Sequence, residues 1–229
     1  MDKNRLSDYN NIDLRAIALD ILLALRTEGA KSHVLLKDTL DKYDYLPNTH
    51  KGFLKRLVNG SIEYRLLADY VIGCFSKTPV NKLKPVIREI FRMSIYQYLF
   101  MDSVPDSAVC NEAVRLTGAR GLKGLKGYVN GVLRSVMRDY DSIKWPDKDK
   151  EPVKWLGVTY SCPELIVSGL LDDYGYDVTE RVLRSSLSEA GVYVRIDESL
   201  GDEMIRAVKE ELAAEGCIAD GDIGNTGDV

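Results

Sequence analysis

Apolar residues recur with the period of an α-helix along most of the first 140 residues. The clearest case begins at Leu125, where apolar side chains fall at i, i+3, i+4, i+7, i+8 and i+11, the spacing of one buried helix face. The members of this face are Leu125, Tyr128, Val129, Val132, Leu133 and Val136. The same period predicts further helices over these approximate ranges: 11–25, 32–40, 49–66, 66–75, 85–99 and 107–116. The sequence therefore predicts a mainly α fold, built as a helical bundle.

Residues at the predicted helix ends support these boundaries. Thr49 is expected to be an N-cap, and Pro85 suits the first turn of the helix that it begins. Further along, Ser161 and Glu164 have the spacing of a capping box, and Gly175 is expected to end the helix that they open. Helical structure is therefore expected to continue well past residue 140.

Two features of the predicted bundle concern its packing. Gly60 lies inside a predicted helix, where glycine costs about 1 kcal/mol relative to alanine, so its presence predicts close helix packing or a bend. The helix that begins at Pro85 is apolar on much of its circumference, which places it at the centre of the bundle. Its aromatic residues Tyr96, Tyr98 and Phe100 could be mistaken for a base-stacking platform, but we expect them to lie in the core.

The character of the sequence changes after Tyr140. Residues 142–155 hold two prolines and alternating charges without a helical period, which marks a linker, and two tryptophans are expected to pin it to the bundle. Val192–Asp197 alternates apolar and polar residues, as a strand does, and a helix is predicted from about 202 to 215. We expect three regions: a helical domain at 1–140, a linker with connector helices at 141–190, and the start of a small α/β (ferredoxin-like) subdomain at 191–229.

Positive charge is concentrated in the front part of the chain. The net charge is −4 overall, but residues 1–139 carry +7 and residues 140–229 carry −11. Gly118, Gly121, Gly124 and Gly127 are three apart and have cations between them, so we expect a glycine-rich loop that can approach phosphate groups closely. Such clustering is typical of a polyanion-binding surface, although basic faces that are merely solvated are also common.

The candidate contact residues follow from this distribution of charge. They comprise the loop cations, two arginines on the polar face of the helix after it, and a cationic pair in the third helix: Arg120, Lys123, Lys126, Arg134, Arg138, Lys55 and Arg56. Asn130 lies on the same polar face, where we expect a structural role for it. Arg134 is equally compatible with a structural role or with contact to a polyanion.

Several classes of protein are disfavoured by composition. The four cysteines are far apart and lack the spacing of metal ligands, so neither a disulfide framework nor a metal site is expected. Neither His33 nor His50 lies near a plausible nucleophile in sequence. The apolar runs are far shorter than the roughly 20 residues of a membrane span, and no signal peptide is evident. A cytoplasmic protein with no membrane partner is the expectation.

Two ordered motifs resemble a known family. VPDSAVCNEAVRL, from Val104, and GYVNGVLR, from Gly127, resemble the NusB-like RNA-binding domain that opens the Sun/RsmB/Fmu family of 16S rRNA cytosine-C5 methyltransferases. Asp13 and Arg15 are similar to the first positions of the D-x-R-x-x-A opening of that domain, and Ala16 follows them directly. The resemblance implies ribosomal RNA as the partner, with a ribosomal protein as a possible second partner, and S-adenosylmethionine as the cofactor of the full-length enzyme.

The chemistry of such an enzyme is not expected within these 229 residues. No glycine-rich loop follows a strand, as a nucleotide-binding unit requires, so no cofactor site is assigned. Cys162-Pro163 inverts the Pro-Cys order of the family's catalytic cysteine and lies in the linker region, so no catalytic residue is assigned. We therefore expect an N-terminal portion of a longer enzyme, which docks it on ribosomal RNA.

Two alternatives remain open. One is a free-standing NusB-like antitermination factor, which would act in the regulation of transcription, although residues 155–216 exceed what such a factor needs. The other is a helical module that binds protein only. A partner complex that persists at high salt without RNA affinity would identify that last class.

Overall fold

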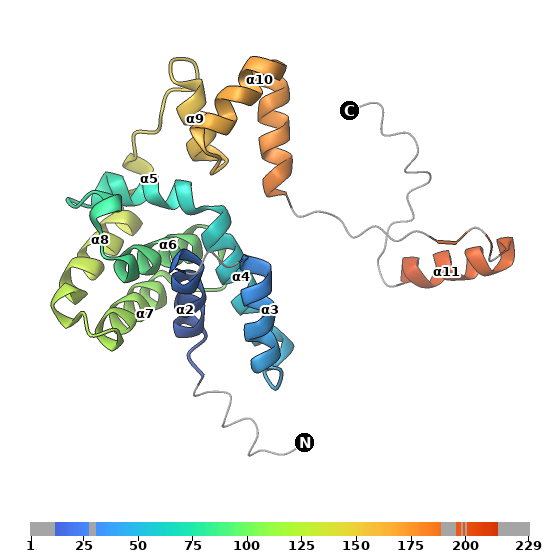
Figure 1. Cartoon of the computed structure of the whole chain (residues 1–229), viewed down its shortest axis with the longest axis horizontal. Helices are drawn as coiled ribbons and strands as arrows, with labels where there is room; N and C mark the ends of the chain where they lie inside the picture. The colour runs from blue at the N-terminus through green and yellow to red at the C-terminus, as the bar shows by residue number, and fades with distance from the viewer. Residues whose placement is uncertain (1–11, 28–30, 189–195, 198, 200, 215–229) are drawn as a thin grey trace. The chain divides into compact units, whose positions relative to one another are not determined.

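The computed structural model describes residues 12–27, 31–188, 196–197, 199 and 201–214. Contacts divide the chain into two compact units, 1–188 and 189–229, and each is described by itself. The larger unit is a helical bundle with a helical extension (Figure 1). No helix in the described ranges is long and apolar enough to cross a membrane.

Helices form all the regular structure of the described residues. In the first unit the α-helices are α2 (Leu14–Thr27), α3 (Ser32–Lys42), α4 (Asn48–Glu63), α5 (Arg65–Phe75), α6 (Pro85–Phe100), α7 (Asp106–Ala119), α8 (Lys126–Asp139), α9 (Pro152–Thr159) and α10 (Glu164–Leu187). Short 3₁₀ turns are η1 (Val80–Lys82), η2 (Lys123–Leu125) and η3 (Tyr140–Ser142). The helices predicted from periodicity in the first 140 residues are confirmed.

The predicted α/β subdomain is not seen. In the second unit the described residues form one helix, α11 (Asp202–Ala214), at the place where a helix was predicted. Most of the expected strand, residues 192–195, lies outside the described residues, and Ile196 and Asp197 have no regular structure. The fold is therefore all-helical wherever it is described, and the ferredoxin-like part of the predicted fold class is corrected accordingly.

Helix α6 lies at the centre of the bundle. It contacts α2, α4, α5, α7 and α8, which surround it in Figure 1. Its buried positions extend around most of the helix, as its largely apolar circumference predicts: Ile87, Glu89, Ile90, Phe91, Met93, Ser94, Ile95, Tyr96 and Gln97. Tyr96 is 7% exposed, while Tyr98 and Phe100 pack against the core cluster, so the prediction of a structural role for these aromatic residues is confirmed.

Gly60 allows α4 to pack closely against α6. A Cβ atom placed on Gly60 would lie 1.9 Å from Cζ and 2.4 Å from Oη of Tyr96, far inside van der Waals contact. The Tyr96 ring in turn packs against Tyr64 and Phe100, with ring centroids 5.9 and 5.4 Å away. The glycine is therefore required by the helix contact, and the predicted close packing is confirmed.

Three helices begin immediately after a proline. Pro47, Pro105 and Pro163 are the N-cap residues of α4, α7 and α10, and each has φ near −60° with an extended ψ. No side chain caps these helices by a hydrogen bond. The prediction that Thr49 is an N-cap is wrong, because the helix has already begun at Asn48.

Ser161 joins the extension to the bundle instead of capping α10. Its backbone has a φ of 51°, and its Oγ accepts a hydrogen bond of 3.0 Å from the N–H of Leu66, in the first turn of α5. The predicted capping box with Glu164 is therefore wrong. The left-handed backbone directs the hydroxyl toward α5, whose own N-cap residue, Tyr64, supplies no side-chain bond.

Aromatic contacts fasten the linker to the bundle at one end. Trp145 stacks on Tyr70 with ring centroids 5.5 Å apart, and the hydroxyl of Tyr70 donates to the carbonyl of Lys144. Trp155, in contrast, lies in α9 and packs with the small core of α9 and α10. The prediction that both tryptophans pin the linker to the bundle is thus confirmed for Trp145, whereas Trp155 packs within the extension.

Helix α10 is divided by a kink. Gly175 has φ 72° and ψ 179°, a conformation that interrupts the helix and suits glycine. The predicted stop at this residue is confirmed, although a second helical segment follows at once. Lys148 holds the linker to this region, since its Nζ lies 4.9 Å from the ring centroids of both Trp155 and Tyr176 and forms an ion pair with Glu180.

Candidate nucleic-acid interface

The hairpin of α7 and α8 carries the candidate cations. The turn between the two helices is shorter than the predicted glycine-rich loop. Gly118 lies within α7 and Gly127 lies within α8. Only residues 120–122 lie outside the helical elements, and Gly121 among them has a φ of 75°. The N–H of Leu122 bonds the carbonyl of Thr117, which closes the end of α7. The expected glycine-rich loop is therefore a compact turn followed by η2.

Three cations of this hairpin are exposed and have no ion-pair partner among the described residues: Lys123, Lys126 and Arg134. Lys123 begins η2 and Lys126 begins α8. Lys126 lies along α7, since a Cβ on Gly118 would be 3.4 Å from its Cδ and Cε. Lys126 and Arg134 are eight residues apart, so they lie on one side of α8, about 12 Å apart along its axis. The opposite face of α8 is buried through Val129, Val132, Leu133 and Val136.

Two other candidate arginines of the hairpin are engaged within the protein. Arg120 forms an ion pair of 2.7 Å with Asp20 and donates to the carbonyl of Ala16, which fastens the end of α7 to α2. Arg138 is exposed and binds its neighbour Asp139 at 2.6 Å. The hydrogen bond from Arg138 and the positive charge of its guanidinium hold the pKa of the Asp139 carboxyl below its usual range. The positive charge of both arginines is thus partly neutralised locally.

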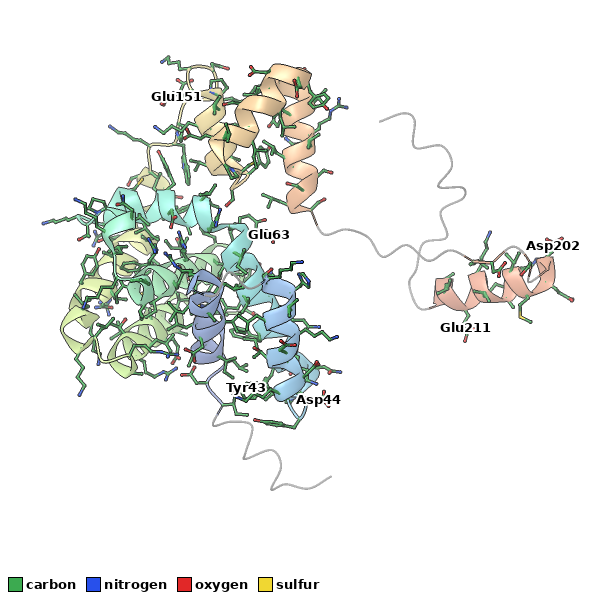
Figure 2. The ribbon with its side chains drawn as sticks, in the orientation of Figure 1. Tyr43, Asp44, Glu63, Glu151, Asp202 and Glu211 are labelled. Carbon is green, nitrogen blue, oxygen red and sulfur yellow. The ribbon has the colours of Figure 1, made fainter. Side chains whose placement is uncertain are left out.

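The candidate pair on α4 lies elsewhere in the bundle. Arg56 donates to the carbonyl of Phe100 at the end of α6, where a cation suits the negative end of the helix dipole. Lys55 borders a groove of about 430 Å³ between α3 and α4, which also holds Lys37, Lys51 and Asp44. Figure 2 labels Asp44 at the end of α3, where it pairs with Lys51 at 2.6 Å. No described contact joins these two residues to the hairpin.

Asn130 lies between Lys126 and Arg134 on α8 and is half-buried. Its side chain has no hydrogen-bond partner among the described residues, so no contact there accounts for the structural role predicted for it. Arg134 stands near Cys110, whose pKa is raised chiefly by burial and lowered to a smaller extent by the charge of Arg134.

A polar cleft that sequence reasoning did not identify lies beside the start of α2. Its volume is about 580 Å³, and Asp13, Arg15, Glu112, Arg115 and His50 line it. Asp13 accepts from the N–H of Ala16 and pairs with Arg115, which also binds Glu112. These two hydrogen bonds raise the pKa of Arg115, whereas burial lowers that of Arg15. The D-x-R-x-x-A motif was the available signal, because Asp13 and Arg15 build one wall of this cleft.

Cys162 does not have the environment of a nucleophile. It lies in the turn between α9 and α10, where burial raises the pKa of its thiol. A reactive cysteine needs the opposite shift, toward the thiolate. Among the described residues, no group of three or more histidine, cysteine or carboxylate side chains is arranged to hold a metal ion.

The fold and the hairpin define a NusB-family domain. Residues 13–138, from the start of α2 to the end of α8, match the model of the NusB family, and the chain belongs to that family. It is 33% identical over 203 residues to the probable ribosomal RNA small subunit methyltransferase B of Bacillus subtilis (strain 168), which covers 89% of this chain and 44% of that protein. The corresponding protein of Synechocystis sp. (strain ATCC 27184 / PCC 6803 / Kazusa) is 31% identical over 169 residues, 74% of this chain and 37% of that protein.

Shorter relatives match only the bundle. The transcription antitermination protein NusB of Dictyoglomus thermophilum (strain ATCC 35947 / DSM 3960 / H-6-12) is 30% identical over 106 residues, 46% of this chain and 73% of that protein. The chain spans less than half the length of the two methyltransferase relatives described above.

Solved structures agree on the fold. The match to the crystal structure of PH0851 covers 90% of this chain and 45% of the PH0851 chain, with a TM-score of 0.58 and 19% identity. NusB in the complex of antitermination factors NusB and NusE with double-stranded RNA matches 56% of this chain and 95% of its own, with a TM-score of 0.51 and 20% identity.

Proposed function

We propose that this chain is the RNA-binding region of a 16S rRNA (cytosine-C5) methyltransferase that uses S-adenosylmethionine, and that it docks the enzyme on ribosomal RNA. The observation that carries the proposal is the length of the similarity to methyltransferase B. It spans 89% of the chain, and the family match to the bundle ends at residue 138. The extension formed by α9 and α10 is therefore shared with a methyltransferase relative.

The docking surface in this proposal is the exposed side of the α7–α8 hairpin. Lys123, Lys126 and Arg134 are exposed and have no carboxylate partner in the described structure, so their charge is available to phosphate groups. Arg120 and Arg138 lie on the same hairpin, but each would have to share its guanidinium with a carboxylate. Lys55 and Arg56 would form a separate, secondary contact. Ribosomal RNA is the proposed partner, and a ribosomal protein is proposed as a second one.

The test compares the affinity of two RNAs at several salt concentrations: a small-subunit ribosomal segment and an unrelated RNA of equal length. The variant carries Lys123→Ala, Lys126→Ala and Arg134→Ala. Each phosphate contact to a single strand contributes about 0.7 to the slope of log K against log salt, so three lost contacts should lower the slope by roughly 2. The matched control removes three exposed cations on α10 and α11, Arg181→Ala, Arg206→Ala and Lys209→Ala, and should leave most of the slope intact.

An unchanged slope in the hairpin variant would refute this location of the surface. An absence of RNA binding by the wild-type chain, even at low salt, would refute the docking role and favour a module that binds protein only. The one observation that supports a free-standing antitermination role is the similarity to transcription antitermination proteins NusB. It requires a bundle that acts without α9 and α10, so RNA affinity that is independent of the extension would favour it.

A further inference from the structure

A second polar cavity lies on the bundle where α2, α3, α4, α5 and α6 meet. Its volume is about 290 Å³, equivalent to several water molecules. Three apolar side chains line part of it. The polar lining consists of three arginines, one carboxylate and two hydroxyl groups: Arg26, Arg65, Arg92, Glu89, Ser32 and Ser61. None of these residues belongs to the α7–α8 hairpin.

The carboxylates near this cavity are already bound by arginine. Glu89 is 3% exposed, and its Oε1 accepts from Arg26 at 3.0 Å and from Arg92 at 2.9 Å. Arg92 also donates from Nε and Nη2 to the two oxygens of Asp69, at 2.8 and 2.6 Å. Burial alone would lower the pKa of Arg92, but these hydrogen bonds and the negative charges of both carboxylates outweigh it and raise the pKa. The two carboxylates and Arg92 thus form one satisfied network.

Positive charge exceeds negative charge around the cavity. Nε of Arg88 lies 4.0 Å from Oε1 of Glu89. Together with Arg26 and Arg92, it makes three arginines around the two carboxylates of the network. Arg65 is a fourth. The pKa of Arg88 is lowered by burial and by the like charges of Arg26 and Arg92. Arg65 has no ion pair with any described residue, and Glu63, labelled in Figure 2 at the end of α4, forms none with it. Among the described groups, two positive charges remain unbalanced.

The unused donors point to one kind of ligand. Arg26 commits Nη1 to Glu89 and keeps its other N–H groups, while Arg65 keeps all of its own. Ser32 is the first residue of α3, a helix of 11 residues without a side-chain cap, so free backbone N–H groups lie beside its hydroxyl. A tetrahedral anion with several acceptor oxygens matches two guanidinium groups and a hydroxyl better than a carboxylate does.

We propose that this cavity binds a phosphate group, held by Arg26 and Arg65 with the assistance of Ser32. The group is either a free phosphate anion or one phosphate of an RNA backbone, and the chemistry of recognition is the same. This assignment does not depend on the role proposed for the hairpin. In either case the anion would neutralise the surplus charge and link α2, α3 and α5.

The first experiment measures binding of inorganic phosphate to the whole chain by calorimetry, against chloride at equal ionic strength. Arg65→Gln is the informative variant, because Arg65 holds no other described group in place and its loss should leave the fold intact. It should weaken phosphate binding roughly tenfold, since a charge-assisted hydrogen bond is lost. Arg26→Gln should act in the same direction, and Arg181→Gln, an exposed arginine on α10, is the matched control.

The second experiment separates the two sources of phosphate. A salt slope for RNA that falls by about 0.7 in Arg65→Gln identifies the ligand as an RNA phosphate. Weaker binding of inorganic phosphate with an unchanged RNA slope identifies a free anion. If neither phosphate binding nor the RNA slope differs between Arg65→Gln and Arg181→Gln, the cavity is not a phosphate site and the proposal is overturned.

Discussion

Replacing Gly60 with alanine tests the packing of α4 on α6. The added Cβ would lie 1.9 and 2.1 Å from two ring carbons of Tyr96, so the ring or a helix has to move by more than 1 Å to restore contact near 3.4 Å. Tyr96 is nearly buried and is held between Tyr64 and Phe100, which leaves little room for the ring to turn away. We expect overpacking to cost roughly 3 kcal/mol, the upper part of its usual range. Helix propensity returns about 1 kcal/mol, so the net loss is about 2 kcal/mol.

Chemical denaturation followed by far-ultraviolet circular dichroism measures this loss. The matched control is Gly131→Ala, which makes the same change inside α8, where nothing lies within 4 Å of the new Cβ. That control should stabilise the protein by up to about 1 kcal/mol. A second substitution, Tyr96→Leu, should make Gly60→Ala much less costly, because it removes the ring that the methyl group meets. If Gly60→Ala and Gly131→Ala stabilised the protein equally, the close contact between Gly60 and Tyr96 would be refuted.

Three further predictions concern side chains that the bundle uses internally. Ser161→Ala should destabilise the protein by about 1 kcal/mol and speed hydrogen exchange of the Leu66 amide; unchanged exchange would exclude the bond between them. Arg120→Ala should cost up to about 1 kcal/mol, since its partner Asp20 is partly exposed, and a double-mutant cycle with Asp20→Ala that shows no coupling would contradict the ion pair. The Cys162 thiol, whose pKa is raised by burial, should be alkylated more slowly at about pH 8 in the folded protein than in urea; equal rates would show that it is accessible and unperturbed.

The helical bundle could be predicted because its helices are strongly amphipathic. The face of α8 that periodicity assigned to the core is buried at Val129, Val132, Leu133 and Val136. Helix starts were harder to predict, since a residue caps a helix only when its own backbone is extended and not yet helical. At α4 the proline at position 47 takes that place, so Thr49 falls inside the helix. Sequence spacing alone does not distinguish these two arrangements.

The candidate site could be predicted only as a distribution of charge. The polar side of the hairpin follows from the same periodicity, and Lys123 and Lys126 are exposed there. The partners of Arg120 could not be predicted, because Asp20 and Ala16 are about 100 residues away and meet it only when α7 packs on α2. The same reason hides the cavity around Glu89, whose arginines come from three separate helices, α2, α5 and α6.

The central position of α6 has a consequence for the synthesis of the protein. Three of the helices that cover it, α2, α4 and α5, precede it in the chain, whereas α7 and α8 follow it. A growing chain therefore completes the helix with the most buried positions before two of the neighbours that shield it have been made. Until Val136 has left the ribosome, α6 presents apolar side chains that the finished bundle hides, and such surfaces promote aggregation. The emergence of the 39 residues from Met101 to Asp139 is thus the interval in which a nascent chain most needs a chaperone.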